Sequence, residues 1–242
     1  GGSMSLDRLR YEIRLLGKPV FLMPVLVVAG LALLLTIANR GISASTLARS
    51  MGGSLEILLP LAAGIVVATV ATHDRAMELQ LTMPRKYQRT ASGRFLFILG
   101  WSSLVSVLTS ALLLALHHWR LPEQIADWNQ PWQFLTWQLT WLSSTLWLVA
   151  LGLVLSLLIR SRSASGALLG VFAFAQIMFH NAFNEAAYLH PVYLFPLTFT
   201  PEAHYWLTNR LELLATAVVL LGLAWLLLRR SEMLLSHAPG EE

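Results

Sequence analysis

Long apolar runs alternate with short polar stretches along the chain. A helix needs about 20 residues to cross a hydrocarbon core about 30 Å thick, and six runs approach or exceed that length. The runs cover residues 19–38, 53–72, 95–116, 134–159, 164–183 and 211–228. This pattern predicts an all-α, polytopic membrane protein with six transmembrane helices in one transmembrane domain, residues 19–230, followed by a tail, residues 231–242.

The polar stretch before the first run has its own helical periodicity. Four apolar residues fall on one face of a helix, and the charged residues of the stretch lie off that face. The four are Leu6, Leu9, Ile13 and Leu16. They predict an interfacial amphipathic helix over residues 5–18, in the plane of the membrane surface. A plain basic flank that orients the first span is the alternative. Residues 1–4, a Gly-Gly-Ser expression remnant and the start Met, are left out of the prediction.

The segment from Thr72 to Arg94 is the most charged internal part of the chain. Asp74 is a good N-cap, and the residue before Pro84 is pushed out of the α region, so a short helix is predicted over residues 74–83. Its charged side chains form a narrow stripe on a rod that is otherwise mostly apolar. The basic residues that follow it suit lipid headgroups or an acidic partner surface.

Composition supports a membrane protein and excludes several other classes. Of the 242 residues, 56% are hydrophobic and 12% are charged, and the net charge is +4. A positive charge on so apolar a chain indicates basic loops beside lipids and argues against nucleic-acid binding. The absence of cysteine excludes disulfides. No nucleophile motif, catalytic carboxylate pair or GxxxxGKS/T phosphate loop occurs, so neither enzyme activity nor ATP hydrolysis by the usual route is predicted.

Lys and Arg are unequally divided between the two sides of the predicted helices. One side holds 13 of them and the other holds 4. The larger group is Arg8, Arg10, Arg14, Lys18, Arg75, Arg85, Lys86, Arg89, Arg94, Arg160, Arg162, Arg229 and Arg230, and the smaller is Arg40, Arg49, Arg120 and Arg210. Because cytoplasmic loops carry the excess of Lys and Arg, both termini and residues 72–94 are predicted on the cytoplasmic side of the cell membrane. We call the opposite side outer.

The longest outer connection, residues 180–210, is apolar but interrupted by Pro191, Pro196 and Pro201. Such a segment is too broken for a straight span, and non-helical backbone at membrane depth must be buried in protein or line water. We therefore predict short helices that re-enter the membrane from the outer side, between the fifth and sixth spans.

Three ionisable residues lie near the outer ends of predicted spans. They are Glu56, His180 and Glu212, and at that depth each is predicted to snorkel to water. A carrier driven by protons or ions is expected to have such groups near the midplane of the membrane. Their position at the span ends favours an external source of energy.

Several of these features resemble the membrane subunits of ABC-2 type transporters. In that family a Glu lies about six residues before a Pro, a small or basic residue follows, and a Gly-Lys or Gly-Arg pair opens the next span. Glu78, Pro84, Arg85 and Gly93-Arg94 match this order. The N-terminal helix is similar to the family's elbow helix, and FPLTFTPEAHYWLTNRLELL is similar to its outer re-entrant piece and the start of its last span.

The resemblance implies a permease subunit with a cytoplasmic coupling helix that docks on a separate ABC ATPase subunit. The ATPase would hold ATP and Mg, no cofactor would bind to this chain, and a second permease, identical or paralogous, would complete the path among the membrane lipids. Export is the expected direction by analogy. The residues that the resemblance assigns to ATPase coupling are Asp74, Arg75, Met77, Glu78, Leu81, Thr82, Met83, Pro84, Arg85 and Lys86. An ordinary loop whose charges only set the topology is the alternative.

Two small residues mark the fifth predicted span as a packing helix. Gly166 and Gly170 form a small-xxx-small pair, which lets another helix approach closely. The resemblance assigns this pair to contact with the second permease. Packing inside one subunit is the alternative, because small residues are common at all helix contacts.

Polar and aromatic side chains share one region of the fourth predicted span. Gln133, Trp137 and Trp141 lie on one face, and Gln138 adds a further polar group. These four residues are candidates for the lining of a substrate path. The alternative is structural, since a buried Trp needs a hydrogen-bond partner.

The outer histidines point to a different class of function. His117, His118, His180, His190 and His204 are all predicted on the outer side, with two Glu nearby. They leave open a membrane-embedded metal-dependent enzyme, although their spacing matches no common ligand pattern and no metal site is predicted. A sensor or structural subunit that transports nothing is a second alternative.

Overall fold

The structure is a computed structural model that describes residues 21–30, 33, 37, 50–70, 84–115, 121–159 and 161–229, with the backbone alone for residues 70, 84–91 and 162. Two of the predicted elements, the elbow helix at residues 5–18 and the coupling helix at residues 74–83, lie outside the described residues. Within the described ranges every regular element is helical, so the all-α prediction is confirmed there.

Four of the described helices are long and apolar enough to cross a membrane: Ser50–Thr69, Ser92–Ala115, Gln130–Ile159 and Trp206–Arg229. Two shorter apolar helices, Phe21–Gly30 and Ser163–Met178, lie in the first and fifth predicted spans. The chain is therefore a multi-pass helical membrane protein. Six spans remain a prediction, because two of the six regions contain only these shorter helices among the residues that the structure describes.

The helix boundaries differ from the predicted spans where prolines or polar residues occur. Helix α5 (Pro84–Ala115) begins at Pro84 and not at Phe95, since a proline fits the first turn of a helix, where its missing N–H has no partner to lose. The predicted fourth span comprises α6 (Gln130–Trp137) and α7 (Leu139–Ile159), which meet at Gln138.

The fifth and sixth predicted spans also shift. Helix α8 (Arg162–Met178) ends five residues before Phe183, the predicted end of the fifth span. Helix α11 (Trp206–Arg229) begins five residues before Leu211, so Arg210, predicted in a loop, belongs to a helix.

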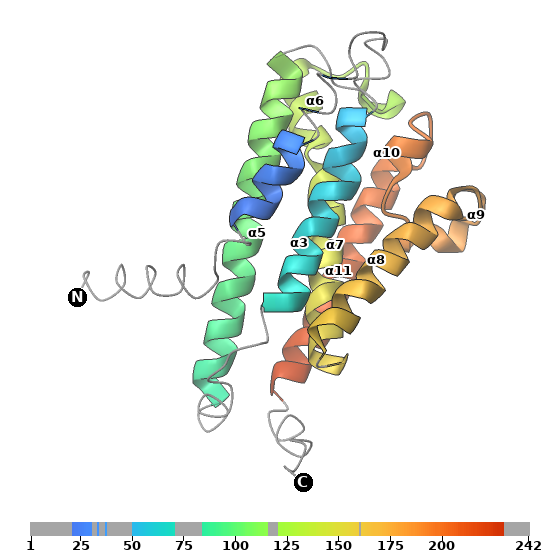
Figure 1. Cartoon of the computed structure of the whole chain (residues 1–242). Coiled ribbons are helices and arrows are strands. Elements are labelled where there is room, and N and C mark those ends of the chain that lie inside the picture. Colours follow the sequence, from blue (N-terminus) through green and yellow to red (C-terminus); the bar gives the residue numbers. More distant parts are fainter. Residues whose placement is uncertain are drawn as a thin grey trace.

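Helix α7 occupies the middle of the bundle. It packs against α3 (Leu59–Val70) on one side and against α11 on another, while α5 and α8 flank this centre on opposite sides (Figure 1). Large apolar side chains remain exposed on the flanking helices, such as Leu96 on α5 and Val171 on α8 (63% each). Such surfaces are expected where lipid or another membrane subunit covers the helix.

A glycine crossing holds α3 against α7. A Cβ atom added to Gly152 would lie 2.6 Å from the Gly64 carbonyl oxygen, and one added to Gly64 would lie 3.0 Å from the Leu148 carbonyl oxygen. The two backbones therefore touch, as small residues allow in membrane helices. The predicted pair on the fifth span is less crowded: Gly166 faces Ile65 at 3.7 Å, within this subunit, and Gly170 has no neighbour within 4 Å.

The two ends of the bundle are built differently. We call them the α10 end, where α6 and α10 lie, and the Arg229 end, where α11 finishes (Figure 1). An apolar cluster toward the Arg229 end joins α3, α5, α7 and α11 through side chains such as Val67, Ile98 and Leu153. The α10 end contains buried charged and polar side chains, described below.

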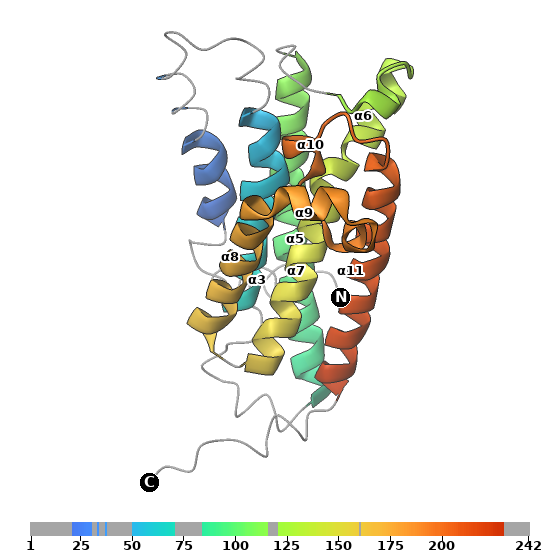
Figure 2. The same ribbon diagram turned by 90° about the vertical axis from the view of Figure 1, so that its right-hand side faces the viewer.

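The chain between α8 and α11 is a series of short helices: α9 (His180–Glu185), η3 (Ala187–Val192) and α10 (Pro196–Phe199). Figure 2 shows α9 turning across the bundle partway along its length, after which the chain returns to the α10 end. Pro196 occupies the first turn of α10, where proline is tolerated. The prediction of short helices in place of a straight span is thus confirmed for this segment.

Candidate functional site: a buried ion pair beneath a proline-broken segment

Glu56 lies in a π-helical turn at the start of the second predicted span. This turn, η1 (Ser54–Leu58), precedes α3, and the Leu59 N–H donates to the Ser54 carbonyl five residues earlier. A π turn contains one residue more than an α turn and is frequently found at functional sites. Glu56 itself is completely buried.

The Glu56 carboxylate binds the first turn of α10. Its Oε1 accepts from the Leu197 N–H at 3.1 Å, and its Oε2 accepts from the Thr198 N–H at 2.7 Å and the Thr198 hydroxyl at 2.6 Å. These two N–H groups have no partner inside their own short helix, so Glu56 acts as a cap supplied from another part of the chain.

Arg210 forms an ion pair with Glu56 and is also completely buried. Its Nη2 donates to Glu56 Oε1, while Nη1 contacts the Ser143 and Ser144 hydroxyls at 3.2 and 3.1 Å and the Leu194 carbonyl at 3.0 Å. The guanidinium carbon lies 5.8 Å from the centre of the Trp206 ring, a cation–π distance. One arginine therefore joins α11, α7, η1 and the segment before α10.

Three further side chains bind the irregular backbone that precedes α10. Gln176 of α8 donates to the Val192 carbonyl at 2.6 Å and accepts from the Leu194 N–H at 2.9 Å. Asn209 of α11 donates to the carbonyls of His190 and Tyr193, at 2.6 and 2.9 Å. Six residues further along α11 from Arg210, Thr216 donates to the Pro191 carbonyl at 3.1 Å.

We call these side chains together the cradle. Its members are Glu56, Ser144, Gln176, Asn209, Arg210 and Thr216. A buried backbone group without a partner costs free energy comparable to a lost hydrogen bond, and the bilayer core offers no water to replace it. The cradle therefore explains how a proline-broken segment remains buried among apolar helices.

The cradle corrects two interpretations of the sequence. Glu56 was predicted to snorkel to water, but it is buried and paired because its turn faces α10 and Arg210. Arg210 was counted among the outer loop charges, but it lies inside the bundle, so the predicted outer group of Lys and Arg is reduced to Arg40, Arg49 and Arg120. The signal that was available is the pairing of opposite charges at equivalent depth in two apolar runs, since a buried charge requires a partner.

Two of the described outer histidines, His180 and His190, pair with aromatic rings and backbone carbonyls. The His180 ring stacks on Phe199 with centroids 4.7 Å apart, and the His190 ring stacks on Tyr205 at 3.8 Å. His190 Nε2 also lies 3.1 Å from the Asn184 carbonyl. Among the residues that the structure describes, no three His, Cys, Asp or Glu side chains gather in a way that could hold a metal ion.

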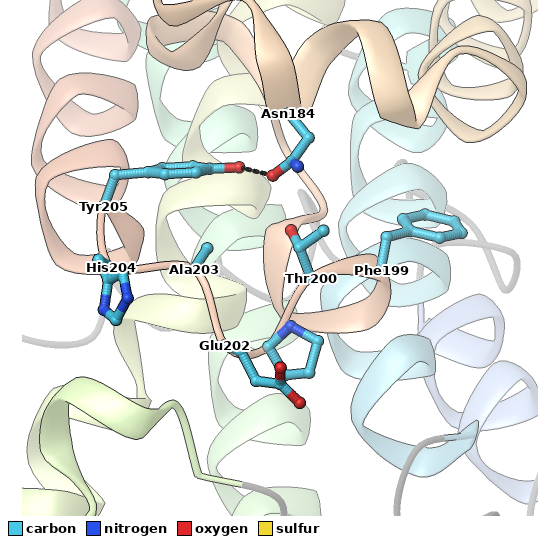
Figure 3. Close-up of a pocket in the computed structure, with 8 residues that line it drawn as sticks. Asn184, Phe199, Thr200, Glu202, Ala203, His204 and Tyr205 are labelled. Atoms are coloured by element: carbon cyan, nitrogen blue, oxygen red, sulfur yellow. Dashed lines mark hydrogen bonds between the residues drawn. The ribbon is translucent and has the colours of Figure 1, made fainter.

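A hollow of about 500 Å³ lies beside these histidines, lined by Asn184 and by residues 199–205. Figure 3 shows the Tyr205 hydroxyl pointing to the Asn184 amide across it, and this hydroxyl donates to Asn184 Oδ1. Burial raises the pKa of the Tyr205 phenol above its ordinary value, so this donor stays protonated at physiological pH. The hydrogen bond ties the end of α9 to the chain that enters α11.

The four residues proposed for a substrate path are mostly engaged in local contacts. The Trp141 indole N–H donates to Gln138 Oε1 at 2.7 Å, and Gln138 Nε2 donates to the Phe134 carbonyl at 3.0 Å. Gln133 Nε2 donates to the Ala126 carbonyl at 2.7 Å. Trp137 is completely buried in the cluster that also contains Trp206. The Trp141 indole thus has the hydrogen-bond partner that a buried Trp needs, and the assignment of these four residues to a substrate path stays a prediction.

Most of the residues assigned to ATPase coupling lie outside the described residues, and the backbone alone is described for the other three. Asp74, Arg75, Met77, Glu78, Leu81, Thr82 and Met83 lie outside the described residues, and Pro84, Arg85 and Lys86 are described only as the first backbone turn of α5. Their role therefore stays a prediction.

Comparison with known proteins does not identify a family. No family model matches the chain, and neither characterised proteins nor solved structures give a match.

Proposed function

We propose that this chain is the transmembrane permease subunit of an ATP-binding cassette transporter. A separate cytoplasmic ATPase would bind ATP and Mg and drive a substrate across or out of the membrane, between this chain and a second permease. The proposal includes six spans, an elbow helix at residues 5–18, a coupling helix at residues 74–83 and cytoplasmic termini. Export is favoured by analogy alone.

The cradle is the observation that carries this proposal. Interrupted backbone at membrane depth is tolerated only where protein buries it or where it lines a water-filled cavity, and transporters use such breaks at their substrate paths. Ionisable residues inside membrane helices are also functional candidates, because burying a charge there costs free energy. The buried Glu56–Arg210 pair is such an ionisable pair, and it binds the interrupted backbone before and within α10. The order of Glu78, Pro84 and Gly93-Arg94 in the sequence supports the coupling helix.

Co-purification tests the proposal directly. The tagged chain is extracted from its host in mild detergent, its partners are identified by mass spectrometry, and ATP hydrolysis of the complex is measured. An ABC ATPase should accompany the wild type. The variant Glu78→Arg should recover at least about tenfold less ATPase, because reversing the charge on a docking helix places like charges against the partner.

A matched charge reversal separates docking from general damage. Glu123 is exposed in η2 (Glu123–Ile125), on the predicted outer side, so Glu123→Arg should leave ATPase recovery unchanged. Both variants should elute as single species in detergent. Equal recovery of the ATPase with Glu78→Arg, or no ATPase with the wild type, would contradict the proposal. So would labelling of Glu78→Cys by an impermeant thiol reagent applied from outside the cell.

A further inference from the structure

The segment from η3 to α10 is attached unequally to its neighbours. Asn209, Arg210 and Thr216 bind it to α11, and Gln176 binds it to α8. On the other side, the side-chain hydrogen bonds that join η1 and α3 to α10 all end on Glu56, within the residues that the structure describes. The side-chain hydrogen bonding between η1 and α10 thus depends on a single carboxylate, beside the apolar packing of Leu55 and Leu59 in one cluster with Leu197.

The turn that presents this carboxylate has a second available geometry. In η1 the Leu59 N–H reaches back five residues to Ser54, whereas an α-helical turn would reach back four. Conversion of the π turn to an α turn shifts the register by one residue and rotates the flanking chain by about 100°, the angle between successive residues of an α-helix. That rotation would carry Glu56 away from the first turn of α10.

We propose that η1 and Glu56 form a latch that opens and closes the joint between α3 and α10. In the closed state, which the structure shows, Glu56 caps α10 and pairs with Arg210. In the open state α10 separates from α3 together with α11, and water enters to hydrate the two charges. Because burying an ion pair carries a large desolvation cost, hydration of the opened pair offsets much of the lost contact.

The latch goes beyond the proposed function and rests on it in one respect, namely that opening would gate the outer end of the substrate path. The joint itself can be tested without any partner. A Cβ atom added to Gly53 would lie 4.0 Å from Thr198 Cβ, inside the range of about 3.5–4.5 Å found in disulfides. The chain contains no cysteine, so introduced thiols have no competitors.

Thiol reactivity in membranes measures how often the joint opens. The single variant Gly53→Cys is treated with a small water-soluble thiol reagent, and its rate of modification is followed. Adding Glu56→Gln should raise this rate at least about tenfold, equivalent to about 1.4 kcal/mol, because an amide neither pairs with Arg210 nor accepts two charged hydrogen bonds. If Gly53→Cys does not express, Thr198→Cys reports on the same joint.

Glu212→Gln provides the matched control. Glu212 is also an acid on a predicted span, but its buried Oε2 accepts no hydrogen bond from the described residues. Removing its charge should leave the rate within about twofold of that of Gly53→Cys, since no contact with α10 is lost. Equal rates in the Glu56→Gln and Glu212→Gln backgrounds would overturn the latch.

The double variant Gly53→Cys/Thr198→Cys tests whether opening is required for transport. After oxidation the complex with the ATPase should keep its composition but lose at least about tenfold in substrate-stimulated ATP turnover, because a cross-link of this length prevents separation of α3 from α10. Reductant should restore the turnover, and each single cysteine should be insensitive to oxidant.

The outcomes distinguish failure of the latch from failure of the proposed function. Full turnover in the oxidised double variant would overturn the gating role of the latch and leave the permease proposal standing. Absence of any ATPase partner would overturn the permease proposal, and the reactivity comparison between Glu56→Gln and Glu212→Gln would still decide whether the joint opens.

Discussion

The α10 end and the Arg229 end of the bundle differ in what supplements their apolar packing. At the α10 end, an apolar cluster that includes Trp137 and Leu197 is joined by buried charges and amides that bind backbone groups one by one, and each of these polar contacts has a defined direction and length. Toward the Arg229 end, apolar side chains such as Val67, Ile98 and Leu153 fill space without directional contacts. Dispersion contacts are weak individually and are shared among many neighbours, whereas each directional bond is made or broken as a unit.

This difference indicates where a conformational change can begin. A packed apolar cluster resists small movements, because any gap loses contacts on all sides. A joint whose side-chain hydrogen bonds all end on one residue can exchange those bonds for water in a single step. The glycine crossing of α3 and α7 lies between the two ends and fixes these helices to each other. We expect the Arg229 end to move as a block and the α10 end to rearrange.

The largest effect on stability is expected from removal of the buried charge of Glu56. Glu56→Gln should lower the free energy of unfolding by about 3–5 kcal/mol, because Arg210 then remains buried without a counter-charge. The measurement is unfolding in mixed micelles with a rising fraction of denaturing detergent. Glu212→Gln serves as the control and should change stability little.

The double variant Glu56→Leu/Arg210→Met sharpens this result. Replacing a buried ion pair by apolar residues is often neutral, but here the Leu197 and Thr198 N–H groups would lose their acceptor. We therefore expect only partial recovery, with a residual loss of about 1–3 kcal/mol for an unpaired buried group. Full recovery would show that the cradle does not support the backbone of α10.

An effect smaller than that of Glu56→Gln is expected from the amide that binds the segment before α10. Gln176→Leu leaves the Val192 carbonyl and the Leu194 N–H without their partner, so stability should fall by on the order of 3 kcal/mol. Gln138→Leu is the same substitution at a half-buried site. The Gln138 amide donates to the Phe134 carbonyl and accepts from the Trp141 indole N–H. It should cost clearly less, and equal losses would contradict the special role of Gln176.

The membrane character and the helical fold could be predicted because apolar run length is a strong signal. So could the broken outer segment, since three prolines in 180–210 exclude a straight span. The helix ends were less predictable. Hydropathy alone does not place the end of α8 at Met178, because Phe179, Ala182 and Phe183 continue the apolar residues beyond it and the break arises from how the chain turns across the bundle.

The cradle could not be assembled from the sequence, because its members are far apart in it. Glu56 and Arg210 are separated by 154 positions, and each taken alone fits a span end that reaches water. Gln176 and Asn209 carry no motif, since their partners are backbone groups of a segment whose path is unknown beforehand. The glycine crossing was not predicted for a similar reason: spacing singles out Gly166 and Gly170, whereas the close backbone approach of α3 to α7 at Gly64 and Gly152 has no signature in the sequence.

Gly152→Ala tests the glycine crossing that fixes α3 and α7 to each other. Its Cβ would lie 2.6 Å from the Gly64 carbonyl oxygen, a backbone atom that cannot turn aside, so α3 and α7 must separate. We expect a loss of about 1–3 kcal/mol in the same unfolding assay. Gly170→Ala meets nothing within 4 Å and should be neutral or stabilising by up to about 1 kcal/mol, since alanine favours helix. A large loss at Gly170 would instead indicate a partner helix on that face.

The smallest expected effect concerns Trp141, where a packing role and a substrate path predict different results. Trp141→Phe removes the hydrogen bond to Gln138 from a side chain that is 3% exposed, which should cost about 1 kcal/mol. Trp132→Phe, at a side chain that is 62% exposed, is the control and should be neutral. If Trp141→Phe left stability unchanged but altered the substrate dependence of ATP turnover, then Trp141 would line the path, and the rearranging part of the molecule would extend from the cradle into α7.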